Sequence, residues 1–289
     1  MGSVATTIDE QIKILEERGM TFDCEESKLK EILLDIGYYK LGFYWHHFQK
    51  DRNHNFFEGT KISDVIKLYY LDVNLKSVLV KAINRIEVNF KTKLIYFVSN
   101  KYKDNPFWFC ASSLVGDYFI DEFPRVYTNK FINDNKPIKS HHKKYPKHTY
   151  APAWKTLEFL SLGSIIVLYS CLKDSNLKKE IALCFGIKKP AIFENYLKTI
   201  VFIRNICAHN DLLYDCNTAK EIETTPMIIF NNNNRHSLDS SIKVILYFLG
   251  QVSINRKNEV EKEINSFFKE HQTNPVISKI LTEKSNYQF

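Results

Sequence analysis

Glycine and proline are scarce in this chain, with 9 and 8 residues among 289. Both residues interrupt helices, so their scarcity favours long helical segments. The sequence also lacks a glycine-rich phosphate loop, an internal repeat and any alternation of strands with helices. These absences predict an all-α protein.

The chain has no apolar run that approaches the roughly 18 residues of a membrane span, and no basic-then-apolar signal peptide at its start. Its six cysteines contain no C-x-x-C pair, which favours reduced thiols in a cytoplasmic protein. The clustered histidines lack a credible set of ligand partners, so we expect no metal and no cofactor. We therefore expect a cytoplasmic protein that does not contact membranes.

The chain is moderately basic, with a formal net charge of +7. Its aromatic content is high, at 14%. A basic excess favours an anionic partner such as nucleic acid. The hydrophobic content of 44% and the charged content of 25% are typical of a globular protein. The composition thus predicts a globular protein and gives mild support for nucleic acid as a partner, although an excess of this size is also common in proteins that bind none.

Apolar residues recur every three or four positions over long stretches, which predicts helices. The longest runs are 65–97 and 191–207, with shorter ones near each terminus. We divide the chain into an N-terminal helical region (1–60), a helical core (61–216) with a basic loop (130–150), and C-terminal helices packed on the core (217–289). The aromatic string 38–45 could form a stacking surface, but its interleaved aliphatic residues favour a buried role.

The periodicity fades between Pro106 and Pro152, which predicts an irregular insert. Within it, residues 136–148 contain five lysines, three histidines and no acid. This segment is either a solvated loop or a contact for the RNA backbone, with an aromatic ring for stacking. The candidate RNA-binding residues in it are Lys139, Lys143, Lys144, Tyr145 and Lys147.

A cluster of polar groups ends the apolar helical run at residues 202–215 and places Arg204, Asn205 and His209 within six positions. An imidazole can move protons near neutral pH, and a guanidinium can hold the charge that develops on a phosphate. Together they can cleave RNA without a metal through attack of the 2′-hydroxyl on the adjacent phosphorus. Asn205 could orient the imidazole or hold a backbone turn.

The same cluster has a simpler interpretation, because cations at the C-terminal end of a helix interact favourably with its carbonyls. Five positions also separate Arg204 from His209, so a regular helix does not align them. His209 should then lie where the helix ends, or the groups should meet through a partner subunit. One imidazole does not easily act as both base and acid, which favours a site composed from two chains.

Arg204-Asn205-x-Cys207-Ala208-His209 resembles the signature of HEPN-domain ribonucleases, in particular the Abi-like abortive-infection family (AbiD/AbiF type). Further blocks agree in order and spacing: Gly37–Leu41, Tyr44-Trp45, Leu68-Tyr69, Arg85–Glu87 and Trp154–Gly163. The resemblance implies a HEPN-type helical bundle with an N-terminal extension, a homodimer, metal-independent cleavage of RNA and a toxin-like role in phage defence. Some relatives are restrained by a small non-coding RNA, which adds an RNA inhibitor to the partners to consider.

Three positions depart from the family pattern. Leu212 replaces a cation, Asp215 replaces an amide, and Lys40 replaces an arginine, keeping the charge but losing the bidentate fork. We expect Lys40 to contact RNA. Four further residues are assigned supporting roles, either as buried partners that position the site or as a solvent-facing stripe: Arg85, Glu87, Glu158 and Tyr214.

The leading hypothesis is a homodimeric HEPN endoribonuclease in phage defence, with Arg204 and His209 catalytic and Asn205 supporting. The alternative is a non-catalytic RNA-binding protein that holds a small structured, antitoxin-like RNA, motivated by the basic charge and by the changes at Leu212 and Asp215. A third hypothesis is a protein-only dimer that senses a phage component.

Overall fold

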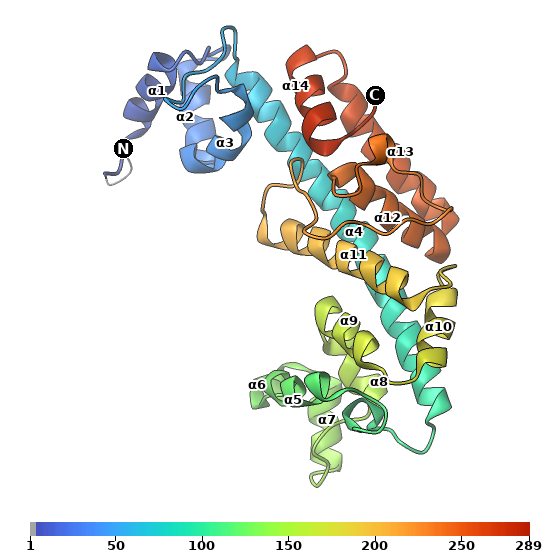
Figure 1. Ribbon diagram of the computed structural model, residues 1–289. Coiled ribbons are helices and arrows are strands. Elements are labelled where there is room, and N and C mark those ends of the chain that lie inside the picture. The colour runs from blue at the N-terminus through green and yellow to red at the C-terminus, as the bar shows by residue number, and fades with distance from the viewer. Residues whose placement is uncertain (1–3) are drawn as a thin grey trace.

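The computed structural model describes residues 4–289 (Figure 1). Within this range the regular structure is helical, with only isolated β-bridges, which confirms the predicted all-α fold. The α-helices of the described chain are α1 (Ile8–Glu17), α2 (Glu26–Asp35), α3 (Tyr38–Trp45), α4 (Ile62–Lys101), α5 (Asp117–Val126), α6 (Asn129–Asp134), α7 (Lys136–Lys144), α8 (Ala153–Thr156), α9 (Leu162–Cys171), α10 (Ser175–Leu183), α11 (Pro190–His209), α12 (Leu238–Val252), α13 (Ile254–Glu270) and α14 (Pro275–Ile280).

Helix α4 is the frame of the molecule. Its 40 residues extend over about 60 Å at 1.5 Å per residue. The buried side chains of Leu68, Leu75 and Leu79 follow the three-and-four spacing that predicted this helix. Helices α11, α12 and α13 pack along it. One continuous cluster of buried residues joins all of these helices.

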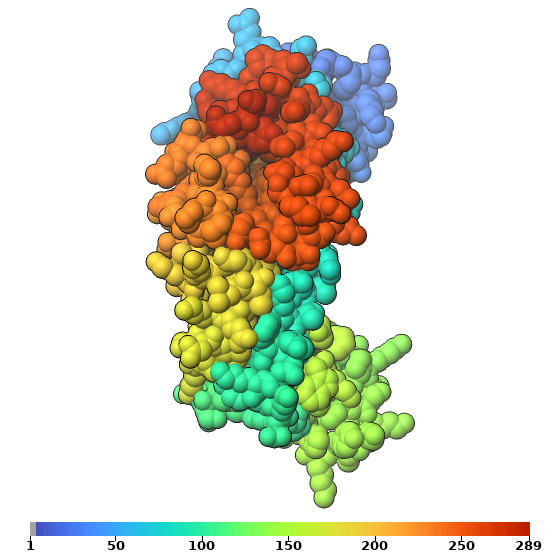
Figure 2. All heavy atoms as spheres, turned by 90° about the vertical axis from the view of Figure 1, so that its right-hand side faces the viewer, coloured from blue at the N-terminus to red at the C-terminus, as the bar shows by residue number. Residues whose placement is uncertain are grey.

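The molecule is elongated along α4 (Figures 1 and 2). Helices α1–α3 lie at one end and α5–α8 towards the other, both on the same side of α4, and the C-terminal end of α11 points to that side (Figure 1). Helices α12–α14 cover a different face, which Figure 2 shows. Among residues 4–289, no helix has an apolar stretch long enough to cross a bilayer.

The basic insert is more regular than its sequence indicates. The prediction of a loop over 136–148 was wrong for 136–144, which form α7. Pro137 lies in the first turn of this helix, where its missing N–H has no helical partner to lose, so it starts the helix instead of interrupting it. Phe123 and Tyr127, from α5 and its end, pack on Tyr150 and anchor the insert.

The aromatic string 38–45 forms α3 and has two faces. Leu41, Tyr44 and Trp45 are buried, in agreement with the predicted core role. Tyr39 and Phe43 point away from the core, with 82% and 46% of their surfaces exposed.

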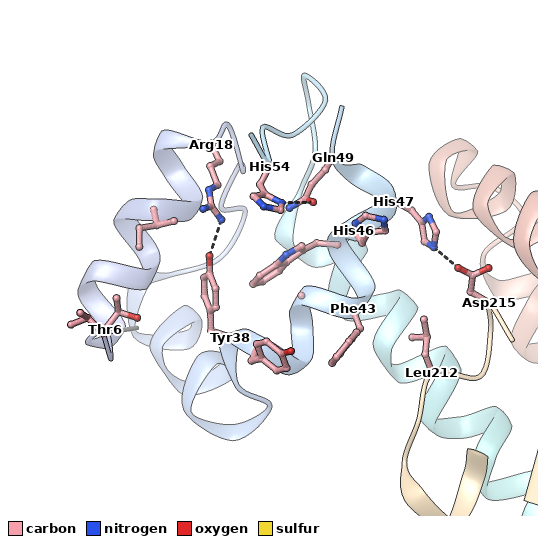
Figure 3. Close-up of a pocket in the computed structure, with 15 residues that line it drawn as sticks. Thr6, Arg18, Tyr38, Phe43, His46, His47, Gln49, His54, Leu212 and Asp215 are labelled. Carbon is pink, nitrogen blue, oxygen red and sulfur yellow. Dashed lines mark hydrogen bonds and ion pairs between the residues drawn. The ribbon is translucent and has the colours of Figure 1, made fainter. Parts of the chain in front are cut away.

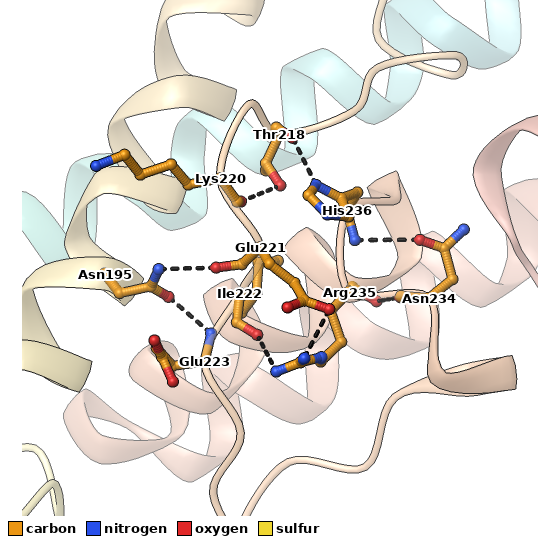
Figure 4. A network of polar contacts seen from close by, with 10 residues as sticks. Asn195, Thr218, Lys220, Glu221, Ile222, Glu223, Asn234, Arg235 and His236 are labelled. Atoms are coloured by element: carbon orange, nitrogen blue, oxygen red, sulfur yellow. Dashed lines mark hydrogen bonds and ion pairs between the residues drawn. The ribbon is translucent and has the colours of Figure 1, made fainter.

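The irregular segment between α11 and α12 is fastened to α11 by side chains (Figure 4). Asn195 donates to the carbonyl of Glu221 (3.0 Å) and accepts from the backbone N–H of Glu223 (2.9 Å). Arg235 pairs with the Glu221 carboxylate at 2.6 Å. His236 contacts the carbonyl of Thr218 at 2.7 Å. These contacts hold the irregular segment, which connects the end of α11 to the C-terminal helices, in place.

Candidate functional site

His209 is the last residue of α11, and its side chain is exposed to solvent. The next residue, Asn210, adopts the left-handed conformation (φ 55°) that ends many helices and that asparagine tolerates. The N–H of Asp211 then donates to the carbonyl of Ile206 at 3.0 Å. The imidazole therefore lies where the helix ends, in agreement with the spacing argument.

Arg204 and Asn205 precede this end on the same helix. The Arg204 Nη1 donates to the Asn205 Oδ1 at 3.2 Å, which uses one of the five guanidinium donors. Arg204 is half-buried and Asn205 is exposed. Five residues rotate a helix by about 140° beyond one full turn, so Arg204 and His209 leave α11 in different directions. Within residues 4–289 they share no hydrogen bond.

A buried carboxylate holds the turn that follows His209. Asp72 of α4 is fully buried, and its Oδ1 accepts from the backbone N–H groups of Leu213 (3.1 Å) and Tyr214 (2.7 Å). Its Oδ2 accepts from the Tyr44 hydroxyl at 2.9 Å and pairs with Lys76 at 2.7 Å. Every oxygen of this buried charge thus has a partner, which makes the turn rigid.

Two lysines complete this network on Asn210. Lys76 donates to its side-chain oxygen at 3.1 Å, and Lys40 of α3 donates to its backbone carbonyl. Burial and the neighbouring Lys76 lower the pKa of Lys40. A helix C-terminus carries partial negative charge that repels phosphate, and these ammonium groups offset it. Lys40 thus contacts the turn that follows His209, residues 210–215, which we call the motif turn. Its contact with RNA stays a prediction.

Two of the three positions that depart from the family pattern, Leu212 and Asp215, lie in or beside this turn. Asp215 pairs with His47 at 3.0 Å. Burial raises the pKa of Asp215, but the hydrogen bond and charge of His47 outweigh this effect and lower it overall. The carboxylate is therefore ionised and engaged. Leu212 is half-buried, and Tyr214 is fully buried with its hydroxyl 3.4 Å from the carbonyl of Phe43. Tyr214 helps to position the turn through packing.

Of the other proposed supporting residues, Arg85 and Glu87 lie further along α4, and Glu158 lies just after α8. Arg85 and Glu158 expose their side chains, as expected of a solvent-facing stripe. Glu87 pairs with the buried Lys91 at 2.7 Å, and Lys91 also donates to the carbonyl of Leu160 at 2.6 Å. This contact joins α4 to the start of α9. Within residues 4–289, the hydrogen bonds of Arg85, Glu87 and Glu158 do not reach the motif.

The basic residues of the insert are exposed on α7 and just beyond it. The Tyr145 ring stacks on His148 with an interplanar angle of 11°, which leaves 41% of Tyr145 exposed. The insert lies at the opposite end of the molecule from α3 (Figure 1). The structure does not bring these residues to His209, so any RNA contact here is separate from the motif. The exposed lysines are Lys139, Lys143, Lys144 and Lys147.

A groove of about 890 Å³ lies between α1, α3 and the motif turn (Figure 3). Its walls include aromatic rings of α3, several histidines and, from the turn, Leu212 and Asp215. Sequence reasoning missed this groove because its two sides come from distant segments. Among the described residues, no group of three His, Cys, Asp or Glu side chains could hold a metal ion.

Sequence reasoning also missed Asp72 and Lys76, although a signal was present. Position 72 continues the buried series formed by Leu68, Leu75 and Leu79, yet it carries a charge. A carboxylate at such a position, with a lysine four residues later, indicates a buried polar network instead of a surface pair.

Comparison with known families gives one match. The profile of the family described as Abi-like protein matches residues 31–215, which is more than half of the chain. The match begins within α2 and ends at Asp215, so it includes Asp72, Lys76 and the whole motif. No curated protein and no solved structure matches the chain.

Proposed function

The chain belongs to the Abi-like protein family, and on that premise we propose that it is a metal-independent endoribonuclease of the HEPN type that acts in abortive infection. The observation that carries the proposal is the placement of Arg204, Asn205 and His209 at the solvent-exposed end of α11. The buried network of Asp72 and Lys76 fixes the turn beside them. Exposed groups on a rigid support suit catalysis.

The proposed reaction is an internal phosphoryl transfer. His209 takes the proton from a ribose 2′-hydroxyl, whose oxygen attacks the adjacent phosphorus. Arg204 holds the non-bridging oxygens as their negative charge grows. A second imidazole protonates the leaving 5′-oxygen, so the products are a 2′,3′-cyclic phosphate and a 5′-hydroxyl.

The geometry of one chain favours a site shared between two. Each chain offers one imidazole at the end of α11, and Arg204 leaves the helix in a different direction from His209. A second copy that places its α11 end against the first would supply both an acid and a base. We therefore propose a homodimer with a composite site.

The direct test is RNA cleavage by the purified protein in EDTA. We expect cleavage to persist in EDTA, with a cyclic phosphate on the 5′ fragment, because no proposed step involves a metal. End-group analysis of the fragments by mass spectrometry measures this. Intact RNA after incubation, or products with 3′-hydroxyl ends, would contradict the proposal.

A mixed dimer tests the composite site. A dimer of one wild-type chain and one His209→Ala chain, purified through two different tags, is expected to cleave no faster than the His209→Ala homodimer, because one imidazole is missing from the shared site. A mixed dimer that carries Lys198→Ala instead, an exposed residue of the same helix, should keep its activity. Half of the wild-type rate in the first dimer would show that one imidazole suffices.

The second candidate function is non-catalytic binding of a small structured RNA. The ionised Asp215 beside the motif favours it, since a carboxylate next to the reacting phosphate opposes a transition state that gains negative charge. Sequencing of RNA that co-purifies with the wild-type protein separates the two functions. One defined and uncleaved RNA without nuclease activity would support binding.

A further inference from the structure

We propose that the groove between α1 and α3 binds an unpaired nucleobase of the RNA that the motif contacts. The proposal rests on the proposed function for its assignment of RNA as the ligand. It assigns to this groove a role in substrate choice that neither the motif nor the family match specifies.

Helix α3 presents an exposed aromatic surface beside the groove. Tyr39 is 82% exposed and Phe43 is 46% exposed, and their rings meet edge to face with centroids 5.5 Å apart. Tyr38 and Trp45, whose rings also meet edge to face, continue the aromatic lining (Figure 3). Aromatic rings left in solvent beside a groove are what stacking on nucleobases requires.

The walls of the groove carry little net charge. Arg18 donates to the Tyr38 hydroxyl at 3.0 Å, while Asp215 is paired with His47. Asp215 thus has a partner, Arg18 makes one hydrogen bond to a neutral hydroxyl, and within residues 4–289 the one arginine that lines the groove is balanced by one carboxylate. A nearly neutral, aromatic groove suits a base better than a phosphate.

The groove also contains polar side chains that can form hydrogen bonds with the edge of a base. His54 contacts the Gln49 Oε1 at 3.2 Å, and both side chains line the groove (Figure 3). His54 adopts a left-handed backbone conformation (φ 66°), which is uncommon for residues other than glycine, and its contact with Gln49 orients its ring. Amide and imidazole groups held in this way can donate to and accept from the edge of a base.

The groove is continuous with the turn that follows His209. Leu212 and Asp215 line the groove, and Leu212 follows His209 by three residues. The Cα atoms of His209 and Leu212 are therefore at most about 11 Å apart. Lys40, next to Tyr39 on α3, donates to the carbonyl of Asn210 and ties the two walls together. A strand with its phosphate at His209 can place a neighbouring base in the groove.

The size of the groove agrees with this ligand. Its volume of about 890 Å³ falls within the range of about 300–1,000 Å³ that small-molecule sites occupy. A base that is paired in a duplex cannot enter it, because only unstacked bases can be splayed onto aromatic side chains. The groove therefore selects single-stranded RNA.

The experiment measures the binding of fluorescently labelled single-stranded RNA to the full-length protein carrying His209→Ala, which prevents cleavage during the measurement. Adding Tyr39→Ala and Phe43→Ala is expected to weaken binding by about 5- to 150-fold for each base that loses its stacking partner. Tyr39→Phe should retain the affinity. The control variant Tyr96→Ala removes a 61% exposed ring from a different helix, α4. This variant should bind RNA like the parent. The same RNA in a duplex should bind more weakly and should not respond to the α3 substitutions.

The outcomes distinguish this proposal from the nuclease proposal. Unchanged affinity after the two α3 substitutions, in protein that melts at the parent temperature, overturns the groove assignment even if the wild type cleaves RNA. Lost affinity supports the assignment even if the wild type cleaves nothing. If the double variant melts early, photo-crosslinking of 5-iodouridine RNA to the parent decides: crosslinked peptides that contain Tyr39 or Phe43 support it, and their absence contradicts it.

Discussion

Replacing His209 with alanine is expected to lower the rate of RNA cleavage by about 10²- to 10⁴-fold, the usual contribution of a general acid or base. The side chain is exposed at the end of α11 and makes no hydrogen bond within residues 4–289. Its removal should therefore leave the fold unchanged. Single-turnover cleavage of a defined RNA, with thermal melting in parallel, measures both effects.

Substitutions on the same helix serve as controls for this experiment. Arg204→Lys keeps the positive charge but loses the planar fork, so it should lower kcat by less than Arg204→Ala. Lys198→Ala removes an exposed cation and should leave kcat unchanged, although it can raise KM through weaker attraction of RNA. Equal cleavage by the wild type and His209→Ala would refute the catalytic assignment.

Replacing Asp72 with alanine is expected to lower the free energy of unfolding by about 3–5 kcal/mol, the typical cost of removing one partner from a buried ion pair. The substitution leaves the ammonium of Lys76 buried, and it removes the acceptor of two backbone N–H groups and of the Tyr44 hydroxyl. Urea denaturation, followed by circular dichroism, measures this loss.

The matched control for this variant is Asp121→Ala, which removes an exposed carboxylate of α5 and should change the unfolding free energy by less than about 0.5 kcal/mol. Adding Lys76→Met to Asp72→Ala should recover part of the loss, because no charge then stays buried without a partner. If Asp72→Ala unfolds at the same urea concentration as the wild type, the network does not stabilise the turn.

The local pattern of the sequence was sufficient to predict much of the helical framework. The spacing of apolar residues predicted α4 and α11, because the helices bury a continuous stripe and the stripe is visible in the sequence. The apolar spacing did not predict the helices of the insert, for a physical reason. Its helices α5–α7 have only 10, 6 and 9 residues, α5 contains an internal proline and α7 carries few apolar residues, so no long apolar stripe marks them. Aromatic contacts such as that between Phe123 and Tyr150 hold the insert instead.

The candidate site also has a part that the local sequence predicts and a part that it does not. Arg204, Asn205 and His209 lie close together in sequence, so a local motif could identify them. The residues that support them lie far away in sequence: Asp72 precedes Leu213 by more than a hundred positions, and Lys40 reaches Asn210 from α3. The groove likewise joins α1 and α3 to the motif turn. Such meetings depend on tertiary packing, which no local pattern encodes.

Helix α4 holds two segments that are anchored to it at a fixed distance from each other. Asp72 anchors the motif turn and Lys91 contacts the carbonyl of Leu160 just before α9, and their separation of 19 positions corresponds to about 28 Å along the helix. The helix keeps these two anchoring points at a constant separation. The insert lies at the opposite end of the molecule from α3 (Figure 1), so an oligonucleotide too short to span from the motif to the insert can engage one of them but not both at once, and affinity should rise abruptly once a strand becomes long enough to reach both.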